Sequence, residues 1–239
     1  MDTVLYEKPM RVELVGTILF VQGSQTKKTT RTLSQMQKTL MSPPTGIPEV
    51  DMYYMYRNVY KADDIRFDVT VIPSTSIKGE CAKTHGHYHP GSEEGPAYPE
   101  VYQVLRGQAS FVLQKKNRNG SVDVMVVNAG EGDAVLLPPG WGHVSVNRGD
   151  DVLVLSNLVY DRFESLYSEY EDNQGAAYYI MKDGELVHNT NYIVHEMERL
   201  SAKELASRHG FSCGDLLQEF HADPRKFGFL KSPKLLFKG

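Results

Sequence analysis

Three histidines lie close together in the stretch Lys83–Pro90, at positions 85, 87 and 89. Alternate residues of an extended strand project from the same face, so a strand here would place His85, His87 and His89 side by side. Two imidazoles at i and i+2 can reach one metal ion, with ligand nitrogens about 2.0–2.2 Å from it. Three of the chain's eight histidines within five residues therefore indicate a metal site, and a surface cluster without a function is the alternative.

A fourth histidine, His143, lies in a second informative stretch. It follows a Pro-Gly turn between two apolar runs that we expect to be strands. The spacing of this stretch matches the second motif of the cupin family at each position. The matching residues are Gly132, Pro138, Gly140, His143 and Asn147.

The first cupin motif is matched in part. The pair His87 and His89 supplies its histidines, and Glu100 is followed by six residues and then Gly107, as the motif requires. The departure is the spacer: ten residues, 90–99, separate His89 from Glu100, where most cupins have far fewer. A longer loop at this point changes the mouth of the barrel.

This pattern resembles the cupin-type glucose-6-phosphate isomerases first known from archaea. The resemblance covers roughly residues 10–190 and is most specific in 84–107 and 132–147. The motifs that carry it are Thr84-x-Gly86-His87-x-His89, Pro99-Glu100-Val101-Tyr102, Leu105-x-Gly107 and, upstream, Arg31-x-Leu33-Ser34-x-Met36.

By this resemblance the metal ligands are His87, His89, Glu100 and His143, while His85 falls at a variable position and is not expected to bind metal. A set of three histidines and a carboxylate leaves open positions on an octahedral ion, as catalysis requires. The resemblance implies Fe²⁺, and nitrogen and oxygen ligands of this kind also suit Mn²⁺, Ni²⁺ or Zn²⁺.

The resemblance also implies the residues that handle a sugar phosphate. We expect Glu100 to be a general base as well as a ligand, and Tyr102 to join it in catalysis. The other expected substrate contacts are Thr70, Thr84 and Gly86 at the phosphate and Tyr167 at the sugar. A histidine expected near position 166 is absent, so a proton-transfer scheme that uses it is not expected in this chain. We also expect Trp141, two residues before a ligand, to form a wall of the pocket.

The predicted function is interconversion of glucose 6-phosphate and fructose 6-phosphate, a reaction of glycolysis and gluconeogenesis, through an enediolate or a direct hydride shift. A bound metal can polarise a carbonyl and stabilise an enediolate. Two alternatives stay open. One is another metal-dependent cupin enzyme such as an oxygenase. The other is a sugar-sensing regulator with a helix-turn-helix near residues 204–212, although residues 196–239 hold only eight Lys and Arg against six Asp and Glu.

The elements that must position these residues are mostly strands. Short apolar runs separated by Gly, Pro or Asn turns predict an all-β jelly-roll barrel, the double-stranded β-helix of the cupins. We expect this domain over residues 1–195, with a short helix at 34–40 and a single strand at 12–21. Residues 196–239 form a helical C-terminal extension, and Ser201 with Glu204 fits a capping box. Asn119-Gly120 and Asp183-Gly184 predict hairpins.

The composition excludes several classes of protein. With 239 residues, 41% hydrophobic and 23% charged, the chain can bury a sizeable core. The net charge of −4 argues against nucleic-acid or membrane binding, so a sugar phosphate must be bound by local donors and the metal. Two cysteines, no signal peptide and no membrane-spanning run predict a cytoplasmic protein. The resemblance implies a homodimer.

Overall fold

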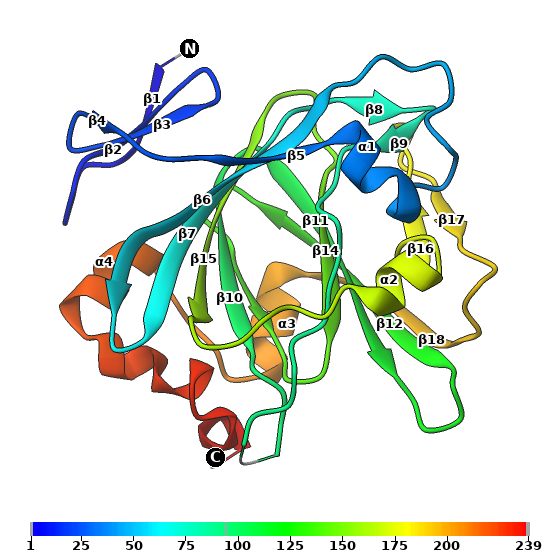
Figure 1. Ribbon diagram of the computed structural model, residues 1–239. Coiled ribbons are helices and arrows are strands. Elements are labelled where there is room, and N and C mark those ends of the chain that lie inside the picture. Colours follow the sequence, from blue (N-terminus) through cyan, green and yellow to red (C-terminus); the bar gives the residue numbers. More distant parts are fainter. Residues whose placement is uncertain (1, 94, 238–239) are drawn as a thin grey trace.

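Two mainly antiparallel sheets face each other in a jelly-roll barrel (Figure 1). The structure is a computed structural model that describes residues 2–93 and 95–237. One sheet contains, in spatial order, β13 (Ala134–Leu137), β10 (Glu100–Arg106), β15 (Leu153–Tyr160), β7 (Ile65–Ile72), β6 (Asp51–Ala62) and β5 (Thr29–Thr32). The other contains β14 (Gly142–Asn147), β11 (Gln108–Lys116), β12 (Val122–Gly130) and β18 (Val194–Ser201). The predicted all-β barrel is confirmed.

Alternation along the strands separates the inside of the barrel from its outer faces. On β7, Phe67, Val69 and Val71 belong to an outer apolar cluster, whereas Arg66, Asp68 and Thr70 line a pocket inside. A strand with side chains on both faces buried must be covered on its outer side as well. The N-terminal and C-terminal segments provide that cover for this sheet.

The N-terminal residues form a small separate sheet beside β6, dark blue in Figure 1. Its strands are β1 (Asp2–Tyr6), β2 (Val12–Val15), β3 (Ile18–Val21) and β4 (Ser24–Gln25). The expected single strand at 12–21 is therefore wrong: the chain reverses at Gly16-Thr17 into a hairpin. Gly16 has φ of +62°, which glycine adopts without a Cβ penalty.

The outer face of the second sheet is covered by residues 168–192. This segment contains α2 (Ser168–Asp172), β16 (Tyr178–Ile180) and β17 (Leu186–His188), and the predicted hairpin at Asp183-Gly184 is confirmed. Tyr170, Ala177 and Tyr192 pack here against Val144 and Val146 of β14. The short hairpin of β8 (Ser76–Ile77) and β9 (Glu80–Cys81) lies at the same end of the molecule.

The helices lie outside the barrel. The expected helix at 34–40 is present as α1 (Leu33–Met36) and the 3₁₀ turn η1 (Gln37–Thr39). At the C-terminus, α3 (Ala202–Arg208) begins at Ser201, whose hydroxyl accepts a hydrogen bond from the Glu204 N–H in the predicted capping box. It is followed by α4 (Leu216–Ala222), η2 (Pro224–Leu230) and η3 (Pro233–Phe237).

The C-terminal helices pack on the barrel separately. Leu205 of α3 joins the core between the sheets, whereas Leu216 and Phe220 of α4 join the outer cluster over β6 and β7. The barrel strand β18 runs across the expected domain boundary at 195, because it pairs in parallel with β12 from Val194 to Ser201. The division into a barrel domain and a C-terminal extension itself stays a prediction.

The hairpin predicted at Asn119-Gly120 joins β11 to β12. Its loop spans residues 117–121, is closed by a hydrogen bond from the Asn117 N–H to the Ser121 carbonyl (2.8 Å), and has positive φ at Gly120. No helix in the described ranges, 2–93 and 95–237, is long and apolar enough to cross a membrane.

Candidate active site

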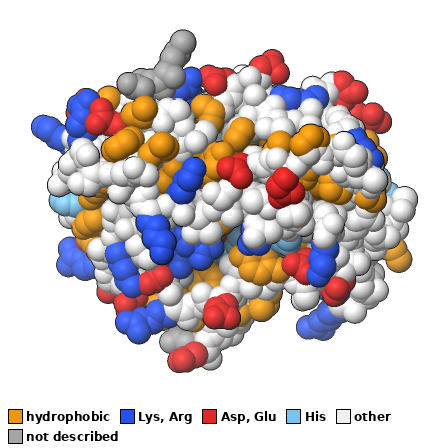
Figure 2. Space-filling model, turned by 45° about the horizontal axis from the view of Figure 1, so that its top comes forward, with side chains coloured by type: hydrophobic (Ala, Val, Ile, Leu, Met, Phe, Trp, Pro, Cys, Tyr) orange, Lys and Arg blue, Asp and Glu red, His pale blue; other side chains and the backbone are white. Residues whose placement is uncertain are grey.

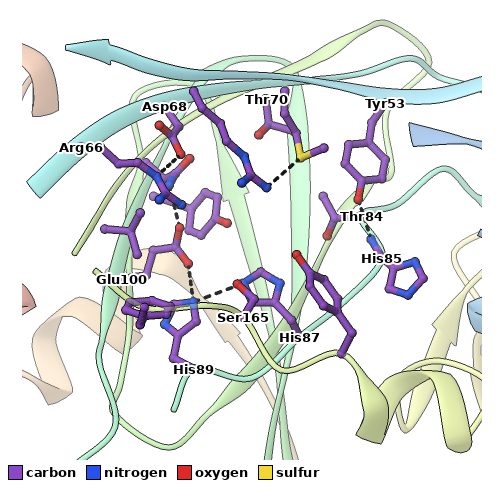
Figure 3. Close-up of a pocket in the computed structure, with 17 residues that line it drawn as sticks. Tyr53, Arg66, Asp68, Thr70, Thr84, His85, His87, His89, Glu100 and Ser165 are labelled. Atoms are coloured by element: carbon purple, nitrogen blue, oxygen red, sulfur yellow. Dashed lines mark hydrogen bonds and ion pairs between the residues drawn. The ribbon is translucent and has the colours of Figure 1, made fainter. Parts of the chain in front are cut away.

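A pocket opens inside the barrel, against the inner faces of β6 and β7 (Figure 3). Alternate residues of these strands form one wall. A loop before α2 and the segment with the histidine cluster form the others. In Figure 2, histidine side chains are visible in a hollow with blue Lys and Arg side chains at its rim. The lining residues are Tyr53, Met55, Arg57, Arg66, Asp68, Thr70, Thr84, His85, His87, His89, Glu100, Tyr102, Asn157, Val159, Phe163, Ser165 and Tyr167.

Strand pairing brings the expected ligands together from three parts of the chain. The segment with His87 runs antiparallel beside β14, and His87 and His143 exchange backbone hydrogen bonds of 3.2 and 3.0 Å. Glu100 is the first residue of β10 in the facing sheet. Because both sheets turn these residues inward, their side chains meet at the base of the pocket.

The four expected ligands present one atom each to a common point. His87, His89, Glu100 and His143 have ligand atoms that all lie within 4.8 Å of one another. The His87 and His89 Nε2 atoms are 3.2 Å apart, and Glu100 Oε2 is 3.3 Å from His89 Nε2 and 3.4 Å from His143 Nε2. Atoms bound at about 2.1 Å to an octahedral ion would be separated by about 3 Å at right angles and about 4.2 Å across it. The cluster has these dimensions.

The protonation pattern favours a cation between these atoms. His89 Nδ1 lies 2.9 Å from the Tyr98 carbonyl, which can only accept, so Nδ1 carries the proton and Nε2 offers a lone pair. Glu100 Oε2 is buried and has no hydrogen-bond donor in the described residues. The lone pairs of His89 Nε2 and Glu100 Oε2 face each other at 3.3 Å and repel, and an ion bound by both atoms would remove the repulsion.

The pKa values of three expected ligands, His87, His143 and Glu100, are shifted toward the protonation states that bind metal. Burial, followed by the neighbouring histidines, lowers the pKa of His87 well below its usual value. Burial lowers the pKa of His143 to about 4, against the opposing attraction of Glu100. Burial alone would raise the pKa of Glu100, but His89, His143 and Arg66 outweigh it, so the pKa is lowered. These shifts favour neutral imidazoles at His87 and His143 and an ionised carboxyl at Glu100, the forms that metal ligation requires.

The structure places most of the expected substrate residues in the same pocket. Thr70, Thr84, Tyr102 and Tyr167 line it. The Thr84 hydroxyl oxygen accepts a 2.9 Å hydrogen bond from the Ser145 N–H, which leaves its own proton available to donate. Gly86 is not among the lining residues, and its backbone has φ of +86° at a point packed against Tyr170.

Tyr102 lies beside the four expected ligands rather than at the mouth of the pocket. Its hydroxyl is 3.2 Å from His143 Nε2, and burial together with the Glu100 charge raises its pKa well above the usual value. The phenol therefore stays protonated at neutral pH. It can donate a hydrogen bond to a carboxylate or to a substrate oxygen.

Two further expectations concern residues beside the ligands. His85 lies outside the cluster: its Nε2 is 3.1 Å from Glu171 Oε1, and its ring packs on Tyr167. Trp141 is not a pocket wall, which corrects the expectation, because it packs against the apolar core between the sheets.

Several lining residues carry no sequence motif. Asn157 of β15 donates a 2.7 Å hydrogen bond to Glu100 Oε1, and Tyr53 of β6 accepts one from the His85 N–H. Ser165 lines the pocket close to the position where a histidine was expected. Tyr53 and Met55 lie in a continuous run of large apolar and aromatic residues, 52–56, so no alternation in the sequence shows which face of the strand is the inner one.

Several known proteins are similar in sequence to the part of this chain that forms the barrel. The family profile of glucose-6-phosphate isomerase (GPI) matches residues 36–196. The glucose-6-phosphate isomerase of Thermococcus litoralis is 27% identical over 160 residues, which are 64% of this chain and 79% of that protein. The enzyme of the same name from Pyrococcus furiosus is 27% identical over 159 residues, 63% of this chain and 78% of that protein.

A bacterial relative and a solved structure were also found. The putative glucose-6-phosphate isomerase 1 of Rhizobium meliloti is 32% identical over 100 residues, 42% of this chain and 43% of that protein. A structure of Lactobacillus farciminis oxalate decarboxylase with formate has a TM-score of 0.37 and 19% identity, covering 49% of this chain and 31% of that one. The family profile spans more than half of the sequence, and the chain belongs to the glucose-6-phosphate isomerase family.

Proposed function

We propose that the chain is a metal-dependent isomerase that interconverts glucose 6-phosphate and fructose 6-phosphate. The observation that carries the proposal is the convergence of three imidazole nitrogens and one carboxylate oxygen in a pocket lined by hydroxyl groups. Family membership supports the choice of reaction. Fe²⁺ is the ion we propose from the resemblance, with Mn²⁺, Ni²⁺ and Zn²⁺ as the other ions that this donor set suits.

The proposed roles follow from where each side chain lies. His87, His89, Glu100 and His143 would hold the ion, which supplies a positive charge that polarises the substrate carbonyl. Tyr102 would donate a hydrogen bond to a substrate oxygen, and Glu100 is the carboxylate that we propose as general base. Thr70, Thr84 and Tyr167 contact the rest of the sugar phosphate from the pocket walls, and the Gly86 backbone is a further proposed contact.

Two routes would move hydrogen between C1 and C2 of the open-chain sugar. In one, a base removes the C2 proton to give an enediolate and returns a proton to C1. In the other, the hydrogen passes directly between the carbons as hydride. Substrate carrying deuterium at C2 distinguishes them, because the label exchanges into solvent in the first route and is retained in the second.

Metal analysis and turnover test the proposal together. The purified chain should contain a divalent metal by elemental analysis, convert fructose 6-phosphate, and lose that activity with chelator. His87→Ala and His143→Ala should each lose metal, whereas His209→Ala, an exposed histidine outside the cluster, should keep it. A metal-replete wild-type protein without turnover would exclude the isomerase.

Assembly and location stay predictions. The resemblance implies a homodimer, and the sequence, with its two cysteines, predicts a cytoplasmic location; we propose both. Sedimentation of the purified chain would test the first, and a monomer at micromolar concentration would contradict it.

A further inference from the structure

Arg57 extends the wall of the pocket on β6. It follows Tyr53 and Met55 at alternate positions, and all three line the pocket. Tyr53 is buried deepest, Met55 is half-buried and Arg57 is exposed. This gradient places a guanidinium at the entrance of the pocket, on the same wall as residues that reach its base.

Arg57 differs from the neighbouring arginine in its partners. Arg66 is 2.8 Å from Asp68 Oδ2 and 3.0 Å from Asp161 Oδ1, so its charge is compensated. The polar contact of Arg57 is a weak one, from its Nη2 to Met55 Sδ at 3.9 Å, and it forms no ion pair among the residues described. Its guanidinium has five N–H donors and forms no ion pair among the described residues, although its charge acts on the Asp68 carboxylate of the same pocket.

The guanidinium lies near the hydroxyls expected to bind phosphate. Its contact with Met55 turns it along β6, and Met55 is the cross-strand partner of Thr70 on β7. Thr70, Thr84 and Arg57 line the same pocket.

We propose that Arg57 binds the phosphate group of the substrate and thereby selects phosphorylated over neutral sugars. A guanidinium can bind two phosphate oxygens at once, with charge-assisted hydrogen bonds. The chain has a net charge of −4 and gives no general attraction to an anion, so binding must come from local groups, and a guanidinium at the entrance is one of them. This inference rests on the proposed function, because it takes the substrate to be a sugar phosphate.

Calorimetry with sorbitol 6-phosphate tests the inference directly. This sugar-alcohol phosphate has no carbonyl, so it binds without turning over. On metal-loaded protein, Arg57→Gln should weaken its binding about tenfold or more, and Arg57→Lys, which keeps the charge but loses the bidentate geometry, should weaken it less. Arg162→Gln is the matched control, because Arg162 is exposed and paired with Asp64 away from the pocket.

Elemental analysis should find the same metal content in each variant as in wild type. That result would exclude damage to the metal ligands as the cause of weaker sorbitol 6-phosphate binding. Binding to Arg57→Gln within twofold of wild type would overturn the inference, and so would absence of binding to wild type. Failure of the wild-type protein to convert fructose 6-phosphate would overturn the proposed function instead, and the binding comparison would still decide the role of Arg57.

Discussion

The two oxygens of the Glu100 carboxylate have different surroundings, and this difference orients the proposed metal site. Oε1 accepts a 2.7 Å hydrogen bond from Asn157 Nδ2, whereas Oε2 faces His89 and His143. Asn157 is opposite Tyr102 in the pairing of β10 with β15, so the strand register fixes its amide. A hydrogen bond from a residue outside the ligand set holds the carboxylate in one orientation. Less side-chain freedom is then lost when the metal binds.

Asn157→Ala should therefore weaken metal binding without removing a ligand. The expected loss is about 10–100-fold in metal affinity, typical of an outer hydrogen-bond partner. Competition with a chromophoric chelator would measure it. Asn191→Ala is the control, because the Asn191 side chain bonds the Asn173 carbonyl at the surface, and its affinity should match wild type. Equal affinity in Asn157→Ala would show that the strand alone orients Glu100.

The sequence predicts the proposed ligands better than it predicts the residues that hydrogen-bond to them. The proposed ligands lie in recognisable motifs, in which Glu100 keeps its spacing to Gly107 although not to His89, so the sequence predicts all four: His87, His89, Glu100 and His143. Asn157 lies in an ordinary apolar strand, and its role depends on which strand pairs with β10. Register between strands distant in sequence is set by packing of the whole barrel, which no local pattern encodes.

At the scale of elements, the segment that carries His87 and His89 depends on Gly86 for its close packing against the rest of the barrel. Gly86 has φ of +86°, and a Cβ there would lie 2.6 Å from the Tyr170 ring and 2.7 Å from Val144 Cγ2. Both neighbours belong to the apolar cluster under α2 and β16. The glycine therefore lets the histidine segment lie close to β14 and to the covering helix.

Gly86→Ala should destabilise the protein by about 2–4 kcal/mol, from left-handed backbone strain and overpacking together. Urea unfolding of metal-free protein would measure the loss. Gly120→Ala is matched in backbone, with φ of +85°, but its Cβ would meet nothing within 4 Å. It should lose only the backbone part, about 1–2 kcal/mol. Equal losses in the two variants would show that the close packing at Gly86 relaxes at no cost.

Local sequence signals predicted some elements and missed others. The capping box at Ser201 and the turn residues Asp183-Gly184 act over a few positions, and both gave correct elements. The apolar run at 12–21 looked continuous, yet it folds back at Gly16-Thr17 because the returning strand can pair with β2. A single glycine within an apolar run is compatible with either outcome, so tertiary pairing decides.

At the scale of the whole molecule, one apolar cluster connects the two ends of the chain through the barrel. Leu14 and Leu19 from the N-terminal sheet, Phe67 from β7, and Phe220 and Phe227 from the C-terminal helices belong to it. Figure 1 shows both terminal segments on the same side, against β6 and β7. The N-terminal sheet and the C-terminal helices each cover apolar surface of the barrel, so unfolding of either segment would expose that surface to water.

Unfolding should accordingly be a single cooperative transition that includes residues 196–239. Phe220 is fully buried, with its ring 5.6 Å from Tyr60 and 5.8 Å from Phe227, so Phe220→Ala should cost about 3–5 kcal/mol of unfolding free energy. Fluorescence of Trp141, the single tryptophan, which packs against the core between the sheets, and far-UV circular dichroism should shift together in urea. Phe220→Leu, which keeps most of the volume, should shift both probes less. A circular-dichroism transition that moves while the Trp141 transition stays in place would instead show that the C-terminal helices unfold as a separate unit.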